Sequence, residues 1–207
     1  ARERIPGARF HFHVWDAEST FSVSRTNYDT FASVLAAQPY AIPVIYRSLS
    51  NSPEFRLLFA DRIQKQFFGT GAFTDENVSN RFVSLRAGMT DAVWHVYHQA
   101  FDSSILNAWI PKRRGWLFQH FTSAGVWFAT CAPVFSMAGG VVSNAMQITI
   151  TNVNASGTIY YTTDGADPRA MGGGIAGMAY TGPLTMEEPS TVKARVLAGS
   201  EWSPLAE

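Results

Sequence analysis

The sequence predicts an α+β protein, with a mainly helical N-terminal part that contains one strand and a small antiparallel β-sandwich after it. Three observations predict this fold class. Apolar residues recur at helical spacing as far as about residue 127. Short alternating segments bounded by turn residues replace them after Pro133, and one alternating segment lies close to the N-terminus. We therefore expect two domains, over residues 1–127 and 133–207.

The composition is that of a folded protein with ample material for a core. Of the 207 residues, 46% are hydrophobic and 15% are charged, which gives no signature of disorder. The 16 Lys and Arg residues balance the 16 Asp and Glu residues, whereas a nucleic-acid-binding domain would carry a basic excess. No run reaches the ~20 apolar residues of a membrane span. We therefore expect neither a nucleic-acid partner nor a membrane span.

The N-terminal alternating segment ends in two carboxylates. Phe10, Phe12 and Val14 fall on one face of an extended strand. Asp16 and Glu18 continue on that face if the chain stays extended, which places both acids at the mouth of a core. They are therefore the candidate catalytic residues and the candidate metal ligands, since Mg²⁺ binds through one or two carboxylates and phosphate oxygens. The alternative is a strand-end pair that caps a helix or faces water.

A helix is predicted to begin at Pro53. Ser52 is a suitable N-cap, and Glu54 is an acid in the first turn. The apolar face predicted to be buried consists of Phe55, Leu58, Phe59, Ile63 and Phe67, and Gly69 ends the helix. The residues expected to face water are Glu54, Arg56, Lys65 and Gln66.

Other helices are predicted on both sides of this one. They span residues 28–49 with a break at Pro43, residues 74–88, residues 90–101, and residues 105–125 with an interruption at Pro111. The second and third are separate because Gly88 ends one and Thr90 opens the next. The basic run over residues 112–114 is expected to be a solvated helix end, since polybasic binding patches are longer.

The C-terminal part contains short alternating segments over residues 146–151, 158–163 and 191–197. Turn residues bound each of them, and their spacing predicts a small antiparallel sandwich. Tyr160 and Trp202 are the candidate substrate-binding residues, because aromatic rings on a sandwich face can stack on sugars. Alternation turns neighbouring Tyr160 and Tyr161 to opposite faces, so that one must be buried, and a core role is the alternative.

The sandwich segment also carries a long ordered pattern. It consists of YYTTDGADP at residues 160–168, YTGPL at 180–184, VKAR at 192–195 and WSP at 202–204. This pattern resembles the chitobiase/β-hexosaminidase C-terminal domain, also called the fibronectin type III-associated repeat. The resemblance implies an immunoglobulin-like sandwich of the kind appended to secreted carbohydrate-active or surface proteins. The insert at residues 171–177 is longer than the link usual in that family. Within the first motif, Asp164 and Asp167 are expected to hydrogen-bond their own turn rather than bind calcium.

The N-terminal part resembles the C-terminal portion of the spore-coat protein H (CotH) kinase-like family. The matching residues are 10–18, 51–62 and 67–74. In that family a Trp-Asp-x-Asp segment supplies the metal-binding carboxylates of an atypical kinase. Asp16 falls on the first of these acids, and Glu18 stands where the family has its second aspartate.

This second resemblance covers only the back part of the family's catalytic domain. The nucleotide lobe, its lysine and the remaining catalytic acid would all precede Ala1, so the chain is interpreted as an internal fragment. The resemblance implies Mg²⁺ in the parent protein, and no cofactor is expected for the isolated chain. It also implies a bacterial extracellular or cell-surface location.

Three functional hypotheses remain. The first is a non-catalytic fragment of a CotH-like surface protein, which acts in attachment and has a polysaccharide or a cell-surface protein as its partner. The second is a glycoside hydrolase with Asp16 and Glu18 as its acid/base pair, because residues two apart on a strand place their carboxyls about 5 to 9 Å apart. The third is an atypical ATP-dependent protein kinase. The identity of the ligand, the oligomeric state and the upstream sequence are left open.

Overall fold

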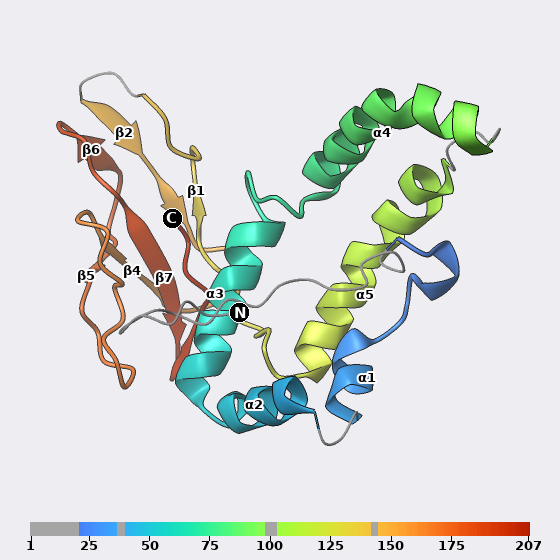
Figure 1. The fold of residues 1–207 in the computed structure, drawn as a ribbon. Coiled ribbons are helices and arrows are strands. Elements are labelled where there is room, and N and C mark those ends of the chain that lie inside the picture. Colours follow the sequence, from blue (N-terminus) through green and yellow to red (C-terminus); the bar gives the residue numbers. More distant parts are fainter. Residues whose placement is uncertain (1–20, 37–39, 98–102, 142–144) are drawn as a thin grey trace, which may run out of the picture.

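A computed structural model describes residues 21–36, 40–97, 103–141 and 145–207. It contains a layer of helices followed along the chain by an antiparallel sandwich (Figure 1), so the predicted α+β class is confirmed. The predicted N-terminal strand, with Asp16 and Glu18, lies outside the described residues.

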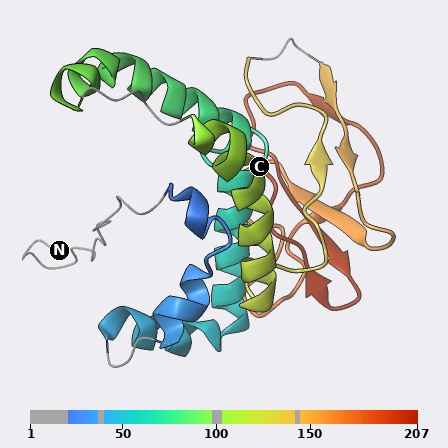
Figure 2. The same cartoon turned by 90° about the vertical axis from the view of Figure 1, so that its right-hand side faces the viewer.

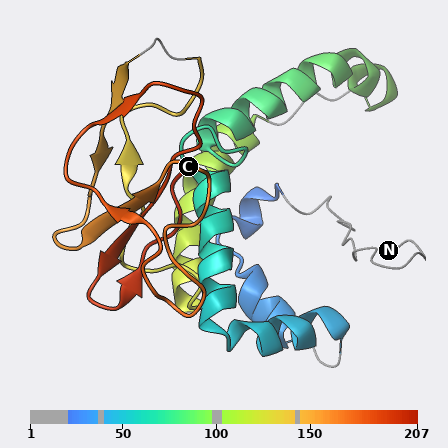
Figure 3. The ribbon, with the colours of Figure 1, turned by 90° about the vertical axis from the view of Figure 1, so that its left-hand side faces the viewer.

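Within the described residues, the helical layer contains five α-helices, one short 3₁₀-helix and one short π-helix. In chain order these are the 3₁₀-helix η2 (Val23–Arg25), α1 (Thr30–Ala36), α2 (Ala41–Ser50), α3 (Pro53–Phe67), α4 (Asp75–Tyr97), the π-helix η3 (Ile105–Trp109) and α5 (Ile110–Ser123). Helices α4 and α1–α2 project from the two ends of α3 and α5, on the side away from the sandwich (Figures 2 and 3). None of these described helices is long and apolar enough to cross a membrane.

Two helix boundaries differ from the prediction. Helix α4 runs unbroken through Gly88, where two helices were expected. The Thr90 hydroxyl donates to the Arg86 carbonyl at 2.8 Å, one turn back, instead of capping a new helix. Pro43 lies in the first turn of α2, where the missing N–H costs no intrahelical hydrogen bond. Pro111 lies in the first turn of α5, directly after η3. The predicted helix over residues 28–49 is therefore divided before Ala41 rather than at Pro43.

An aromatic cluster holds the helical layer together. Its buried members are Ile63, Phe121 and Val126, and the partly buried side chains packed on them are Phe31, Tyr46, Phe59, Phe67, Leu117, Phe118, Ala124 and Trp127. Edge-on ring contacts connect α3 to α5, with centroids 5.8 Å apart for Phe67 and Phe121. Such pairs add to the stabilisation from apolar burial.

The basic run at residues 112–114 lies at the start of α5, as predicted, but only Lys112 is exposed there, and the two arginines are partly buried. The Arg113 guanidinium donates to the Thr26 and Tyr28 carbonyls at 2.7 and 2.9 Å. The Arg114 guanidinium donates to the Phe67 carbonyl at 3.0 Å and lies over the Phe68 ring. Both arginines therefore tie α5 to other segments of the helical layer.

Helix α3 begins as predicted, since the Ser52 hydroxyl accepts the Phe55 amide at 3.4 Å. Its buried face was only partly predicted. Ile63 is buried, but Leu58 is 54% exposed and Leu57 and Ala60 are buried in its place. Helix α3 lies between α5 and the sandwich (Figure 1), so more than one of its faces is covered, which agrees with the additional burial of Leu57 and Ala60.

In the described part of the sandwich the strands form three small antiparallel sheets. Its strands are β1 (Val134–Phe135), β2 (Met146–Ile148), β3 (Ile150–Thr151), β4 (Thr158–Thr162), β5 (Met178–Ala179), β6 (Leu184–Met186), β7 (Lys193–Ala198) and β8 (Glu201–Trp202). They pair as β1–β3, as β2–β6 and in the order β5–β4–β7–β8. The segment over residues 146–151, predicted as one strand, changes partner at Thr149 and forms parts of two sheets.

The sandwich core is small and aliphatic. Ile150, Ile159, Ala194 and Val196 are its buried members. The Ile150 amide donates to the Tyr180 hydroxyl at 3.0 Å, which connects β3 to the sheet that contains β4. Strand alternation turns Ala194 and Val196 into this core and Arg195 to the other side of β7.

Candidate functional site

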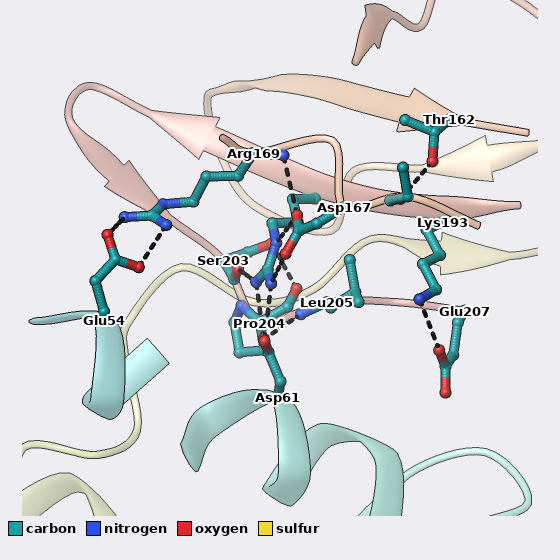
Figure 4. Close-up of polar contacts among 12 residues, drawn as sticks. Glu54, Asp61, Thr162, Asp167, Arg169, Lys193, Ser203, Pro204, Leu205 and Glu207 are labelled. Atoms are coloured by element: carbon teal, nitrogen blue, oxygen red, sulfur yellow. Dashed lines mark hydrogen bonds and ion pairs between the residues drawn. The ribbon is translucent and has the colours of Figure 1, made fainter. Parts of the chain in front are cut away.

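The most heavily bonded side chain between the helices and the sandwich is Arg195. Only 2% of this side chain is exposed. Its guanidinium donates to both Asp61 carboxylate oxygens at 2.8 Å, to the two Asp167 oxygens at 2.8 and 2.6 Å, and to the Ser203 carbonyl at 2.8 Å (Figure 4). These bonds use all five guanidinium N–H groups. The charge on Arg195 can be buried because every one of its donors has an acceptor.

The two carboxylates come from different parts of the chain. Asp61 lies in α3 and also accepts the Leu205 amide at 2.8 Å. Asp167 lies in the turn after β4 and accepts the Arg169 amide at 2.9 Å. Burial opposes ionisation of Asp167, but its hydrogen bonds to Arg195 and to the Arg169 amide outweigh burial and lower its pKa. Burial likewise opposes the charge on Arg195, but its bonds to Asp167 and Asp61 raise its pKa above the ordinary value.

A second ion pair joins the start of α3 to the insert at residues 171–177. The Arg169 guanidinium donates to both Glu54 oxygens at 2.7 and 2.8 Å, and the Gly172 amide donates to Glu54 at 3.0 Å. The hydrogen bond from Arg169, supported by the Gly172 amide, lowers the pKa of Glu54 to about 2. Glu54 was expected to face water, and its 42% exposure agrees with that in part.

Glu207 forms a third bridge to the helical layer. Its carboxylate bonds to Lys65 of α3 and lies 3.7 Å from Lys193 of β7. The bond from Lys65 is the main reason that the pKa of Glu207 is lowered. Outside α3, Glu201 of β8 accepts the Thr130 amide at 3.1 Å, in the connection between the helices and the sandwich.

We call Glu54, Asp61, Asp167, Arg169 and Arg195 the charged clamp. Desolvation offsets much of the Coulombic gain of buried ion pairs, so their net contribution to stability is small. Their bidentate geometry nevertheless fixes angles as well as distances. The clamp therefore sets the orientation of the sandwich on α3, and it does so with residues far apart in sequence.

The two predicted substrate-binding residues lie together. The Tyr160 and Trp202 rings have centroids 5.7 Å apart. Trp202 is only 6% exposed, and its indole N–H donates to the Gly173 carbonyl at 2.9 Å. Tyr160 is half-buried. Their role in sugar binding stays a prediction, and Tyr160 has the more accessible ring.

Acidic side chains in the turn after β4 bond to backbone, as predicted. Asp164 accepts the Ala166 amide at 2.9 Å, in the same manner as Asp167 accepts the Arg169 amide. Among the described residues, no group of three or more His, Cys, Asp or Glu side chains is placed to hold a metal ion. The catalytic and metal-binding roles assigned to Asp16 and Glu18 are untested, because both lie outside the described residues.

The sequence interpretation missed the clamp. Asp61 fell on no predicted polar or apolar face of its helix, and Arg195 was noted only as part of the VKAR motif. The alternation of β7 places Arg195 on the outer face of the strand, where a charged side chain is ordinarily solvated, so its burial had no signal in the sequence. The partner of Arg195 could not be read from spacing either, because Asp61 precedes it by 134 residues.

The fold and the clamp define a helical layer to which an immunoglobulin-like sandwich is fixed in one orientation. Residues 137–203 match the family model of the chitobiase/beta-hexosaminidase C-terminal domain. The matched residues include the strands from β2 to β8, and the resemblance predicted for this part is confirmed. The comparisons give no evidence for the resemblance of the helical part to spore-coat protein H, which stays a prediction. No curated protein and no solved structure matches the chain.

Proposed function

We propose that the chain is a non-catalytic part of a carbohydrate-associated surface protein, and that it attaches this protein to a polysaccharide. The sandwich is the attachment module, and the helical layer is the support that holds it. The observation that carries the proposal is the charged clamp on a module of a carbohydrate-associated family. Parts of one chain with small polar interfaces usually move relative to one another, whereas a five-bond guanidinium between them opposes such motion.

A fixed orientation is useful for attachment, because the orientation of the bound sandwich then determines the orientation of the helical layer. A sandwich on a flexible linker finds its ligand but does not orient what precedes it. In this chain the ion pairs at Glu54 and Asp61 are separated by about two turns of α3, so the sandwich is held at two points along one helix. We infer that the helical part is thereby presented at a set angle to the polysaccharide, at a bacterial cell surface.

A sedimentation assay tests attachment. The whole chain is mixed with insoluble chitin, cellulose or bacterial cell wall, and the fraction that sediments is measured. We expect saturable retention on at least one of the three. Tyr160→Ala, at the half-buried ring beside Trp202, should weaken retention, and Tyr40→Ala, at a ring on the helical layer that is 67% exposed, should not. Absence of retention on all three materials would refute the attachment role.

The kinase-like pattern at residues 15–18 supports a second proposal about the parent protein. In the parent protein Asp16 and Glu18 would bind Mg²⁺, while the chain by itself would bind nucleotide weakly or not at all. Phosphoryl transfer needs a phosphate cradle, a cationic side chain and metal ligands together. We expect calorimetry with ATP–Mg²⁺ to give no micromolar binding. Micromolar binding that Asp16→Asn abolishes would instead support an atypical kinase.

The glycoside hydrolase alternative makes a different prediction from the same two acids. An acid/base pair would release reducing sugar from soluble oligosaccharides, with a pH dependence set by one protonated and one ionised carboxyl. We expect no such release from the whole chain. Turnover that is lost in both Asp16→Asn and Glu18→Gln would overturn the non-catalytic proposal.

A further inference from the structure

The sandwich contains an open cavity that lies outside the charged clamp. Its volume is about 780 Å³, within the ~300–1,000 Å³ typical of small-ligand sites. The larger apolar side chains that line it include those of Phe135, Met137, Ile148, Met186 and Val192.

The cavity follows from the change of partner along residues 146–151. Strand β1 pairs only with β3 and ends at Phe135, while β6 pairs only with β2 and ends at Met186. The segments that continue from these ends, residues 137–141 and 187–192, leave the sheets and both line the cavity. The gap between two diverging segments is therefore part of the fold rather than a packing defect.

The charged side chains that line the cavity are all carboxylates, namely Glu187, Glu188 and Glu207. Glu207 is already bonded to Lys65 and faces Lys193. Glu187 and Glu188 are exposed and form no ion pair with any described residue. Two adjacent carboxylates without a countercharge give this site a negative potential, which favours a cationic ligand.

We propose that this cavity binds an amino sugar with a free ammonium group, as in a glucosamine unit of a polysaccharide. The C–H face of the sugar ring packs on Phe135 and Met186, and the ammonium group faces Glu187 and Glu188. Ser190 and Thr191 also line the cavity and offer hydroxyl groups to the sugar. An acetylated amine is neutral and gains nothing from the two carboxylates. The inference rests on the proposed attachment to carbohydrate and names the class of sugar and its site.

Methionine methyl signals locate the ligand without altering the protein. The whole chain, labelled with ¹³C at its methionine methyl groups, is titrated with a β-1,4-linked glucosamine tetramer at low salt. We expect the signals of Met137 and Met186 to shift, because both residues line the cavity, and those of Met89 in α4 and Met171 in the insert to stay unchanged. Absence of a shift at Met137 and Met186 at millimolar tetramer would overturn the proposal.

The charge requirement is tested with a neutral ligand and a neutral variant. The N-acetylated tetramer, and the double variant Glu187→Gln/Glu188→Gln with the charged tetramer, should each bind roughly tenfold more weakly, since two exposed charge contacts contribute about 1–2 kcal/mol in total. Binding by the variant should also depend less on salt. Glu76→Gln, in the exposed first turn of α4, is the matched control and should change nothing. Equal affinity for the two tetramers, or unchanged binding by the double variant, would overturn the proposal.

The outcomes separate this inference from the attachment role. If the chain is retained on insoluble polysaccharide but the signals of Met137 and Met186 do not shift, the attachment role is supported and the sugar site in the cavity is refuted. If both signals shift but the chain is retained on none of the insoluble materials, the sugar site in the cavity is supported and the attachment role is refuted.

Discussion

The contacts that stabilise the helical layer differ in kind from those that stabilise the sandwich. The helices pack around aromatic rings, with Phe121 in ring contact with Phe31, Phe59, Phe67 and Phe118. The sandwich has a small aliphatic core, and two of its most deeply buried side chains are the polar ones of Arg195 and Ser203. Apolar packing is non-directional and its contribution scales with buried area, whereas the hydrogen bonds of a buried polar side chain depend on geometry.

The two parts also differ in how they cover their apolar surface. Helix α2 turns Ile42, Ile45 and Leu49 outward on one face, with exposures of 58%, 48% and 44%. Strands β4 and β7 of the sandwich instead turn aliphatic residues inward, as Ile159 and Val196 do. The difference teaches that the central strands of the sandwich bury their apolar residues in a core, whereas α2 keeps one apolar face exposed. Substitutions should therefore have very different effects in the two parts.

The largest effect is expected at the clamp. Arg195→Met removes the charge between Asp61 and Asp167 and leaves both carboxylates without it, at a cost of about 3–5 kcal/mol in the free energy of unfolding. Urea denaturation measures this loss. Arg62→Met, at the exposed neighbour of Asp61 in α3, is the control and should change the value by less than about 0.5 kcal/mol. A loss below about 1 kcal/mol at Arg195 would show that the clamp is not closed in solution.

The aromatic cluster should respond almost as strongly. Phe121 is 6% exposed, so Phe121→Ala should cost about 3–5 kcal/mol through lost burial and an unfilled cavity. Phe73, which is 53% exposed, is a control of the same residue type, and Phe73→Ala should cost no more than about 1 kcal/mol. Similar losses at both positions would contradict the packing described for the helical layer.

Acid should weaken the clamp before it affects the aromatic cluster. The pKa of Glu54 is lowered from 4.5 to about 2, and that of Asp167 is also lowered. Because the folded-state values are depressed, these acids contribute stability above about pH 4.5, and that contribution is lost as the pH falls toward 2. Glu54→Gln should reduce stability at pH 7 by about 1 kcal/mol or less, since the pair is partly exposed.

The same variant should flatten the acid limb of a plot of stability against pH. Thermal denaturation from pH 7 to pH 2 measures this slope, with Glu76→Gln as the control for loss of one exposed acid. An unchanged slope in Glu54→Gln would show that the Arg169 ion pair does not form.

Much of the fold could be predicted because local patterns determine it. The cap at Ser52 and the strand over residues 158–162 follow from short-range spacing, and the match of residues 137–203 to a family model was predicted from a resemblance in their motifs. The unbroken helix through Gly88 could not be predicted, since a glycine in a helix interior costs only about 1 kcal/mol and tertiary contacts can override that cost. The change of partner at Thr149 likewise depends on strands that are distant in sequence.

The site was less predictable than the fold. Periodicity indicated that α3 has one apolar face, but a helix between two layers has two, and the burial of Leu57 and Ala60 was missed for this reason. The pairing of Asp61 with Arg195 is a long-range contact between residues that each have an ordinary solvated alternative. Asp167 was correctly predicted to bond its own turn, yet its remaining lone pairs serve Arg195. Sequence patterns thus predict the first hydrogen bond of a side chain more readily than its second.

The smallest effect on stability is expected at the exposed face of α2. Ile45→Ser removes a side chain that is 48% exposed, so the free energy of unfolding should change by no more than about 0.5 kcal/mol. Fluorescence of a dye that binds apolar surface should nevertheless fall, because Ile42, Ile45 and Leu49 form one stripe. Ile63→Ser is the contrasting variant: Ile63 is 4% exposed within the aromatic cluster, so the loss should exceed about 2 kcal/mol and dye binding should rise. If Ile45→Ser destabilised the chain as much as Ile63→Ser, the face of α2 would be covered in solution, and the contrast between the exposed apolar face of α2 and the buried core of the sandwich would fail.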